Sequence, residues 1–314
     1  MYRMGNIIGK GSFCEVIELI PPAQSKSFPT ARGGEQISLS LVLKQPRSDL
    51  DSNKKKDAEE CTRNEINFLS TIQHPNIIKS KPPSCVLKID SKNMIVLERL
   101  HGTLEDKINY WNVNSTHKST TSFSNLWNER IQILSDIADA MSYLHSQSIL
   151  LRDLKPENCG FDMDGNVKLF DFGLAVSLME AKYKVGVDRY HFTMNGGTYR
   201  YMSPEALQEK PYGKASEVYT FALVVWRTMS LQKPFADCKS LGELKRFVSK
   251  GCRPELHRKW PKALGSTISI SWSTNAEARP SFQQLQRQFD VLKRGGTRAT
   301  VRSRNRCLVS WLCR

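Results

Sequence analysis

Three polar side chains in the middle of the chain, Asp153, Asn158 and Asp171, are of the types that handle phosphate and a metal ion. Phosphoryl transfer depends mostly on positioning and on charge neutralisation. Such a site needs one carboxylate at the incoming hydroxyl group, and an amide and a second carboxylate on Mg²⁺. A loop that contains several Asp residues, Pro156 and Gly160 could instead be an ordinary solvated turn, so the surrounding sequence has to decide.

That sequence, ILLRDLKPENCGFDMDGNVKLFD at residues 149–171, resembles the catalytic and metal-binding loops of the protein kinases. It contains the family's R-D-x-x-x-x-N motif, with a Lys-Pro pair inside it, and runs into a D-F-G motif. The joint pattern argues against a solvated turn. The resemblance implies that Asp153 orients the acceptor hydroxyl and that Lys155 offsets charge on the transferred group. It also implies that Asn158 and Asp171 hold Mg²⁺.

A strand ending in a lysine is predicted at residues 37–44 (ISLSLVLK), and it resembles the V-A-I-K strand of the kinases. A lysine at a strand end could simply snorkel to the surface. The helix predicted over 57–71 favours the kinase interpretation, because it carries Glu65 at the place of the lysine's carboxylate partner. Lys44 would then clamp the α- and β-phosphates of ATP, and Val42 would cover the adenine.

A glycine-rich turn between two apolar, β-prone segments is predicted close to the start of the chain. In the kinases such a turn folds over ATP and offers backbone N–H groups to its phosphates. The match to G-x-G-x-x-G-x-V is incomplete, because Cys14 stands in place of the third glycine. The residues that the resemblance places around ATP here are Ile8, Gly9, Lys10, Gly11, Ser12, Phe13, Cys14, Glu15 and Val16.

A buried strand is predicted over 93–97, and the ERLHG segment after it resembles the hinge between the two kinase lobes. The resemblance places Glu98 and Leu100 at the adenine through their backbone. Gly160 stands where a larger apolar residue usually forms the floor under the adenine. We therefore expect either a lower adenine or a neighbour such as Cys159 or Phe161 that fills the gap, together with compensation between Gly160 and Val42.

The segment 174–197 is long and polar enough to be a switchable activation segment. Arg152, beside the catalytic aspartate, suggests control by phosphorylation there, since a phosphate gives a guanidinium a bidentate partner. Thr193 is the leading candidate site and Tyr190 the second. The segment ends in a motif similar to G-T-x-x-Y-M-x-P-E, whose glutamate, Glu205, is expected to pair with Arg279.

Two further departures from the kinase pattern concern the catalytic loop. Leu151 stands where a histidine usually precedes Arg-Asp, which is tolerable because that side chain mainly packs. Glu217 replaces an aspartate that normally bonds the backbone of this loop. Its side chain is one methylene longer, which leaves that bond in question.

Composition is consistent with a folded intracellular protein. The 314 residues are 39% hydrophobic and 25% charged, and the scattered cysteines suggest neither a zinc site nor a disulfide framework. A cytoplasmic or nuclear location is expected, with no transmembrane segment. Residues 293–314 hold Lys293 and six arginines and contribute much of the net charge of +15. This charge supports no specific nucleic-acid partner; a solvated tail is the simpler interpretation, and weak contact with anionic surfaces is the alternative.

The resemblance implies an α+β, bilobal protein-kinase-like fold, with a β-rich N-lobe over 1–100, a helical C-lobe over 101–292, and a basic, disordered tail over 293–314. The implied function is an ATP- and Mg²⁺-dependent serine/threonine kinase that acts on protein substrates. Two alternatives remain open. One is a pseudokinase, which would be a binding or scaffold module, and the other is a kinase-fold enzyme that acts on small molecules.

Overall fold

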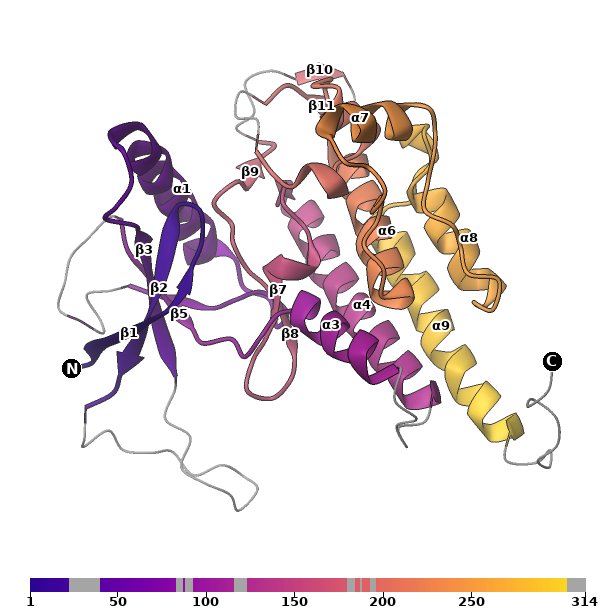
Figure 1. Ribbon diagram of the computed structural model, residues 1–314, viewed down its shortest axis with the longest axis horizontal. Helices are drawn as coiled ribbons and strands as arrows, with labels where there is room; N and C mark the ends of the chain where they lie inside the picture. Colours follow the sequence, from indigo (N-terminus) through magenta and orange to yellow (C-terminus); the bar gives the residue numbers. More distant parts are fainter. Residues whose placement is uncertain are drawn as a thin grey trace.

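The computed structural model describes residues 1–22, 40–82, 87, 93–115, 123–179, 184–186, 188–192 and 196–303. The chain forms two parts, a β-rich part at its start and a helical part that follows (Figure 1). The expected fold class, α+β with a β-rich N-lobe and a helical C-lobe, is confirmed. No helix among the described residues is long and apolar enough to cross a membrane.

The N-lobe is built on a five-stranded antiparallel sheet with the strand order β1-β2-β3-β5-β4. Alternate side chains of its strands point to opposite faces. On one face Leu41, Leu43 and Val96 form part of a small buried cluster, while Val42 and Leu97 on the other face join the main core. The strands are β1 (Arg3–Lys10), β2 (Cys14–Ile20), β3 (Leu41–Pro46), β4 (Ser80–Lys81) and β5 (Ile95–Glu98).

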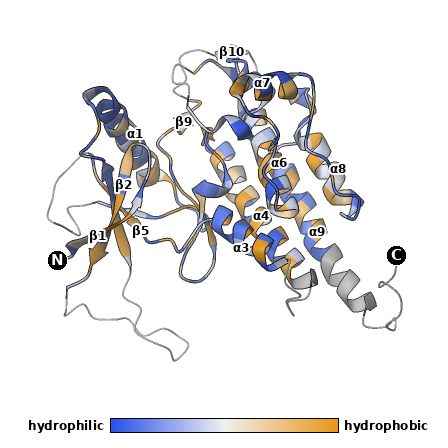
Figure 2. Cartoon of the chain, viewed as in Figure 1, coloured by the Kyte–Doolittle hydropathy of each residue, from blue (hydrophilic) through white to orange (hydrophobic). Residues whose placement is uncertain are grey.

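The long N-lobe helix α1 (Ser52–Thr71) begins five positions earlier than the predicted residue 57. Asp51 caps it, because its side chain accepts a hydrogen bond from the backbone N–H of Lys54 at 3.0 Å. Figure 2 shows that much of the surface of α1 is hydrophilic. Its few buried residues, among them Glu65 and Leu69, therefore define the face that meets the sheet.

The C-lobe is organised around α6 (Lys214–Ser230), most of whose residues are buried. It contacts α4 (Phe123–Ser146) and α8 (Lys262–Ser271), and α4 also packs along α9 (Phe282–Ser303). The rings of Phe221, Phe282 and Phe289 meet edge to face at this centre. The remaining helices are α3 (Leu104–Ser115), α5 (Pro204–Leu207) and α7 (Leu241–Ser249), with 3-10 turns at Pro156–Asn158, Tyr199–Tyr201 and Ala276–Ala278.

Short strand pairs lie at the junction of the two lobes and around the activation segment. β6 (Ile149–Leu150) pairs with β9 (Val176–Ser177), β7 (Cys159–Phe161) with β8 (Val167–Leu169), and β10 (Lys184–Gly186) with β11 (Arg189–Tyr190). The loop between β6 and β7 and the residues after β8 carry the polar side chains singled out above. Figure 1 places β7 and β8 between the N-terminal sheet and α3.

The polar stretch 112–125 is partly helical, since residues 112–115 belong to α3 and 123–125 to α4, while 116–122 lie outside the described residues. One sequence-based expectation about an irregular segment is wrong in part. The tail was expected to be disordered from residue 293, but α9 continues to Ser303. A helix whose first turns are anchored by buried residues is extended at low cost, since each added residue gains a backbone hydrogen bond. Residues 304–314 lie outside the described part.

Candidate active site

Lys44, on β3, lies between two carboxylates. Its Nζ is 2.6 Å from Oε2 of Glu65 on α1 and 2.9 Å from Oδ1 of Asp171 after β8. The predicted pairing of Lys44 with Glu65 is therefore present. It joins β3 and α1 to the D-F-G segment, so three elements far apart in sequence meet at one ammonium group.

The three charges differ in exposure and in pKa. Burial opposes the charge of Lys44, but Asp171 and Glu65 outweigh it and raise the pKa of the ammonium group well above its ordinary value. The positive charge of Lys44 holds the pKa of Asp171 below its usual range. Burial raises the pKa of Glu65, whose side chain is only 1% exposed. Asp171 keeps 43% of its side chain exposed and is thus the carboxylate able to reach a ligand.

Asp153 is held from several sides in the loop after β6. Lys155 Nζ is 2.7 Å from its Oδ2 and also donates to the hydroxyl of Thr198 at 2.8 Å. Thr198 in turn donates to Oδ1 of Asp153 from its backbone N–H and its hydroxyl, both at 2.9 Å. Asn158 Nδ2 donates to the backbone and the carboxylate of Asp153. Because Nδ2 makes both bonds, Oδ1 of Asn158 is the atom that could face a cation.

The backbone on either side of this site is strained. Arg152 has φ of 70° and Asp171 has φ of 68°, a left-handed conformation that costs a residue with a side chain about 1–2 kcal/mol. Such strain persists only where the surrounding structure holds it, and it is common at functional sites. The strain therefore marks these two residues as positions that the fold forces into place.

Glu217 does reach the catalytic loop, which answers the doubt raised by its extra methylene. Its Oε1 accepts from the backbone N–H of Arg152 at 2.7 Å, and its Oε2 lies 2.7 Å from Nε2 of His145. Both side chains are buried. The link ties the start of α6 and the end of α4 to the strained residue just before Asp153.

The glycine-rich turn joins β1 to β2, and Gly11 N donates to Cys14 O at 2.8 Å. Arg47, just after β3, holds the turn by donating from Nη1 to the carbonyl of Gly11 at 2.9 Å. Lys10 pairs with Asp49 at the surface. The bond from Arg47 occupies a carbonyl group of the turn and therefore uses none of the N–H groups that could bind phosphate, although the N–H of Gly11 is already bonded to Cys14.

The predicted ATP-facing residues do not all lie on one side of the sheet. Lys44 pairs with Val16 across the β2–β3 ladder, so these two share a face. Glu15 pairs with Gln45 on the opposite face, where its Oε1 accepts from Gln45 Nε2 at 3.0 Å. The side chain of Glu15 is therefore turned away from Lys44, so its predicted place at ATP would involve its backbone.

The gap at Gly160 is filled by Leu100, not by Cys159 or Phe161 as expected. A Cβ at position 160 would lie 2.6 Å from Cδ1 and 3.1 Å from Cβ of Leu100. Backbone hydrogen bonds fix this approach, since His101 N donates to Phe161 O at 2.7 Å and Phe161 N to Gly102 O at 3.2 Å. The hinge thus lies against β7, and its leucine occupies the volume of the missing side chain.

Gly160→Leu is expected to weaken ATP binding about 10-fold, because overpacking of this kind costs about 1–3 kcal/mol. Adding Leu100→Ala should restore affinity, since it removes the clashing side chain, whereas adding Val42→Ala should not. Titration of ATP against the wild type, the three single variants and the two double variants gives the coupling energies. Equal rescue by Val42→Ala would favour the compensation between Gly160 and Val42 that the sequence suggested.

Arg152 has aromatic partners in this structure. Its Nε donates to the hydroxyl of Tyr212 at 2.9 Å, and its guanidinium lies 4.8 Å from the centroid of the Phe192 ring. Tyr190 is only 7% exposed and packs in a buried cluster with Leu150. Phosphorylation of Tyr190 would require that cluster to open, which makes it a poor second candidate. Thr193, the leading candidate, lies outside the described residues.

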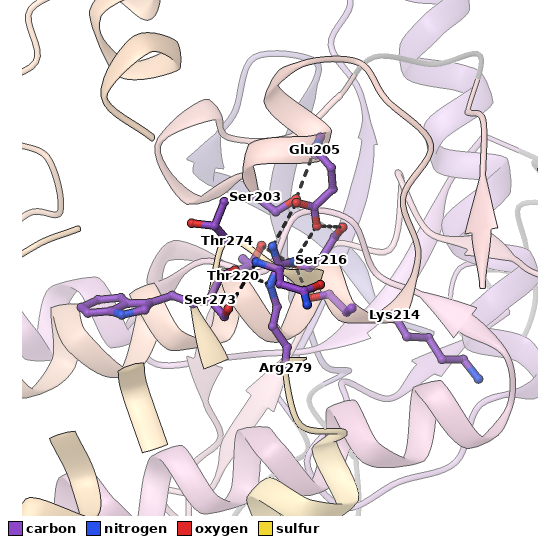
Figure 3. A network of polar contacts seen from close by, with 12 residues as sticks. Ser203, Glu205, Lys214, Ser216, Thr220, Ser273, Thr274 and Arg279 are labelled. Atoms are coloured by element: carbon purple, nitrogen blue, oxygen red, sulfur yellow. Dashed lines mark hydrogen bonds and ion pairs between the residues drawn. The ribbon is translucent and has the colours of Figure 1, made fainter. Parts of the chain in front are cut away.

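The predicted pair of Glu205 and Arg279 is present, and it joins α5 to the residue that follows the 3-10 turn at Ala276–Ala278 (Figure 3). Arg279 donates from Nη1 at 2.5 Å and from Nη2 at 3.0 Å to the two oxygens of Glu205. Ser216, on α6, donates to the same carboxylate at 2.6 Å. Burial raises the pKa of Glu205, but the bonds from Arg279 and Ser216 outweigh burial and leave it below its ordinary value.

Sequence reasoning missed several residues that hold this site together. Thr198 was noted only as part of a motif, although its hydroxyl joins Lys155 to Asp153. Arg47 gave no signal, because an arginine after a strand is ordinary on a protein surface. Asn64, beside Glu65, could have been noticed only by asking which face of α1 its side chain occupies.

Comparison with known proteins places this geometry in context. A family model described as protein tyrosine and serine/threonine kinase matches residues 2–289. The chain is 29% identical over 232 residues to the serine/threonine/tyrosine-protein kinase HT1 of Arabidopsis thaliana, covering 72% of this chain and 53% of that protein. It is 27% identical over 257 residues to the serine/threonine-protein kinase STY46 of the same plant, covering 80% and 39%. It is 34% identical over 196 residues to receptor-interacting serine/threonine-protein kinase 4 of Mus musculus, covering 58% and 24%. The chain thus spans about half the length of these relatives or less.

Proposed function

This chain belongs to the family of protein tyrosine and serine/threonine kinases, and on that premise we propose that it transfers the γ-phosphoryl group of ATP to serine or threonine hydroxyls of proteins. The observation that carries the proposal is the contact of Lys155 with both Asp153 and Thr198. A lysine two residues after the catalytic aspartate is typical of serine/threonine kinases. Here it is anchored where it could offset charge on the transferred group.

Each residue of the site has a role under this proposal. Asp153 accepts the hydrogen bond of the substrate hydroxyl and orients it, since its carboxylate is fixed by Thr198 and Asn158. Lys44 binds the phosphates, and Glu65 keeps it directed towards them. Charge that develops in the transition state is then met by groups that are already in position.

The donor set fits Mg²⁺, which would be held by the carboxylate of Asp171 and by Oδ1 of Asn158. When bound, Mg²⁺ neutralises charge on the phosphates of ATP. It is usually held by one or two carboxylates together with substrate phosphates, not by a cage of protein ligands. The described residues accordingly contain no cluster of three His, Cys, Asp or Glu side chains that could hold a metal.

Phosphorylation of the activation segment at Thr193 is the regulation we propose for this site. It is supported by Arg152, whose guanidinium lies beside Phe192 and Tyr212 and could exchange these partners for a phosphate. Mass spectrometry of active protein tests this. An unmodified segment over 174–197 in fully active protein would count against it.

The experiment that tests the function is an assay with Mg-ATP and general protein substrates, followed by identification of the phosphorylated amino acid. Phosphoserine or phosphothreonine is the expected product. Binding of ATP without transfer would indicate a pseudokinase. Transfer to small-molecule acceptors but not to proteins would favour a kinase-fold enzyme that acts on small molecules. Phosphotyrosine as the sole product would overturn the assignment of serine and threonine as acceptors.

A further inference from the structure

Asn64 makes an unusual set of contacts with the backbone after Asp171. Its Nδ2 lies 2.8 Å from the carbonyl of Ala175, 3.0 Å from that of Gly173 and 3.4 Å from that of Phe172. A side-chain amide has two N–H donors, so the three carbonyl groups share them. One side chain of α1 thus donates to three of the four carbonyl groups in residues 172–175.

Glu65, the next residue of α1, bonds to the same segment through a backbone N–H group. Oε1 of Glu65 accepts from the backbone N–H of Phe172 at 3.2 Å, while its Oε2 binds Lys44. Asn64 therefore supplies donors and Glu65 an acceptor to one stretch of backbone. A Cβ at Gly173 would lie only 3.2 Å from Cβ of Cys61, one helical turn earlier, so α1 lies directly against this backbone.

The segment needs an external hold because Asp171 has a left-handed backbone, with φ of 68°. Such a conformation lasts only where its surroundings impose it. Phe172 is fully buried, so packing fixes the position of its ring. A buried ring does not by itself set the direction of the peptide groups around it, whereas hydrogen bonds to their carbonyls do.

We propose that Asn64 is a positioning residue that couples the placement of α1 to the backbone at Asp171. When α1 is seated, Glu65 orients Lys44 and Asn64 holds the peptide groups that aim the carboxylate of Asp171. The inference rests on the proposed kinase function for its catalytic consequence. Its structural content, a backbone clamp formed by a side-chain amide, does not depend on that function.

The decisive variant is Asn64→Asp, which keeps the shape of the side chain but replaces the donor amide by a carboxylate facing three carbonyl oxygens. Asn64→Ala removes the amide without adding charge, and it serves if the first variant folds poorly. Asn67→Asp is the matched control. Asn67 is exposed on the same helix, so this control adds the same charge without touching the segment.

Two measurements test the proposal. In the transfer assay, Asn64→Asp should lower kcat about 10-fold and raise the Mg²⁺ concentration needed for half-maximal rate several-fold, while Asn67→Asp changes neither. In hydrogen–deuterium exchange of the protein without ligands, the amides of residues 172–175 should exchange faster in Asn64→Asp and Asn64→Ala than in the wild type and the control.

The outcomes separate this inference from the proposed function. An inactive wild type would overturn the kinase assignment, and the exchange data alone would then decide on the clamp. If the wild type is active but Asn64→Asp matches Asn67→Asp in Mg²⁺ dependence, the coupling is wrong. Unchanged exchange over 172–175 in both Asn64 variants would also overturn it.

Discussion

Lys44→Met and Asp171→Asn will each lower the rate of phosphoryl transfer at least about 1,000-fold, because a preorganised charge aimed at the transition state is the kind of group whose removal costs most in catalysis. Lys44 is held between Glu65 and Asp171 at 2.6 and 2.9 Å. Met keeps the length of the side chain but removes its charge. Asn keeps the shape of Asp171 but removes the negative charge that would bind the metal.

The fold should survive both changes. Lys44→Met leaves Glu65 buried without its cationic partner, and burial already raises the pKa of this carboxyl group, so we expect Glu65 to take up a proton in the variant instead of remaining as an unpaired charge. Asp171 is 43% exposed, so Asn there is solvated.

Steady-state assays of both variants against the wild type measure the loss of rate, and circular dichroism verifies that the variants are folded. Lys54→Met is the control, because Lys54 is also a lysine of the N-lobe but is 62% exposed and pairs with Asp51 at the start of α1. Undiminished transfer by both Lys44→Met and Asp171→Asn would contradict the enzyme assignment. A folded, inactive pair beside an active Lys54→Met is the expected result.

The parts of the site that could be predicted from the sequence are those in which residue type and spacing carry the chemistry. Lys44 and Glu65 pair as predicted, and Asp171 lies at the same ammonium group, because each of the three lies in a segment with a readable pattern. The contact of Lys44 with Asp171 was not itself predicted. The fold class followed from the same segments. The start of α1 was misplaced because the cap at Asp51 is a local hydrogen bond with many alternative sites nearby in a polar stretch.

The parts that could not be predicted depend on where side chains lie in three dimensions. Whether Glu217 reaches the backbone of Arg152 depends on the position of α6 to within the length of one methylene group. Leu100 fills the space at Gly160 because the hinge bonds to β7, a pairing of segments about sixty residues apart that no local pattern indicates. The contacts of Asn64 could not be predicted either, because a polar residue on a largely polar helix gives no sign that its amide meets the backbone after Asp171.

Glu205→Ala is expected to lower the free energy of unfolding by about 3–5 kcal/mol, since removing one partner of a buried ion pair leaves the other charge unpaired. The side chain of Arg279 is 0% exposed and that of Glu205 is 16% exposed. Arg279 makes other bonds, to the carbonyls of Ser273 and Ala215, but carbonyl oxygens do not neutralise its charge. The loss should appear in urea unfolding as a lower midpoint.

A surface pair close by provides the matched control for this prediction. Glu277 pairs with Arg189 at 3.1 Å, but their side chains are 78% and 54% exposed. Exposed ion pairs contribute about 0–1 kcal/mol, so Glu277→Ala should leave the unfolding midpoint almost unchanged. Equal effects of Glu205→Ala and Glu277→Ala would mean that burial adds nothing to the Glu205–Arg279 pair.

The contribution of the Glu205–Arg279 pair to the free energy of unfolding depends on pH, and the pKa of Glu205 sets the direction of this dependence. Its folded-state pKa lies below the ordinary value, so the unfolded chain binds the proton more readily than the folded one. The stabilisation is therefore fully present above a pH of about 4.3, the ordinary glutamate value, and is lost as pH falls through the folded-state pKa. In Glu205→Gln this component should disappear, so the difference in unfolding free energy between wild type and variant should shrink as the pH is lowered from 6 towards 3. A difference that stays constant over that range would show that Glu205 stabilises the lobe by packing and not through its charge.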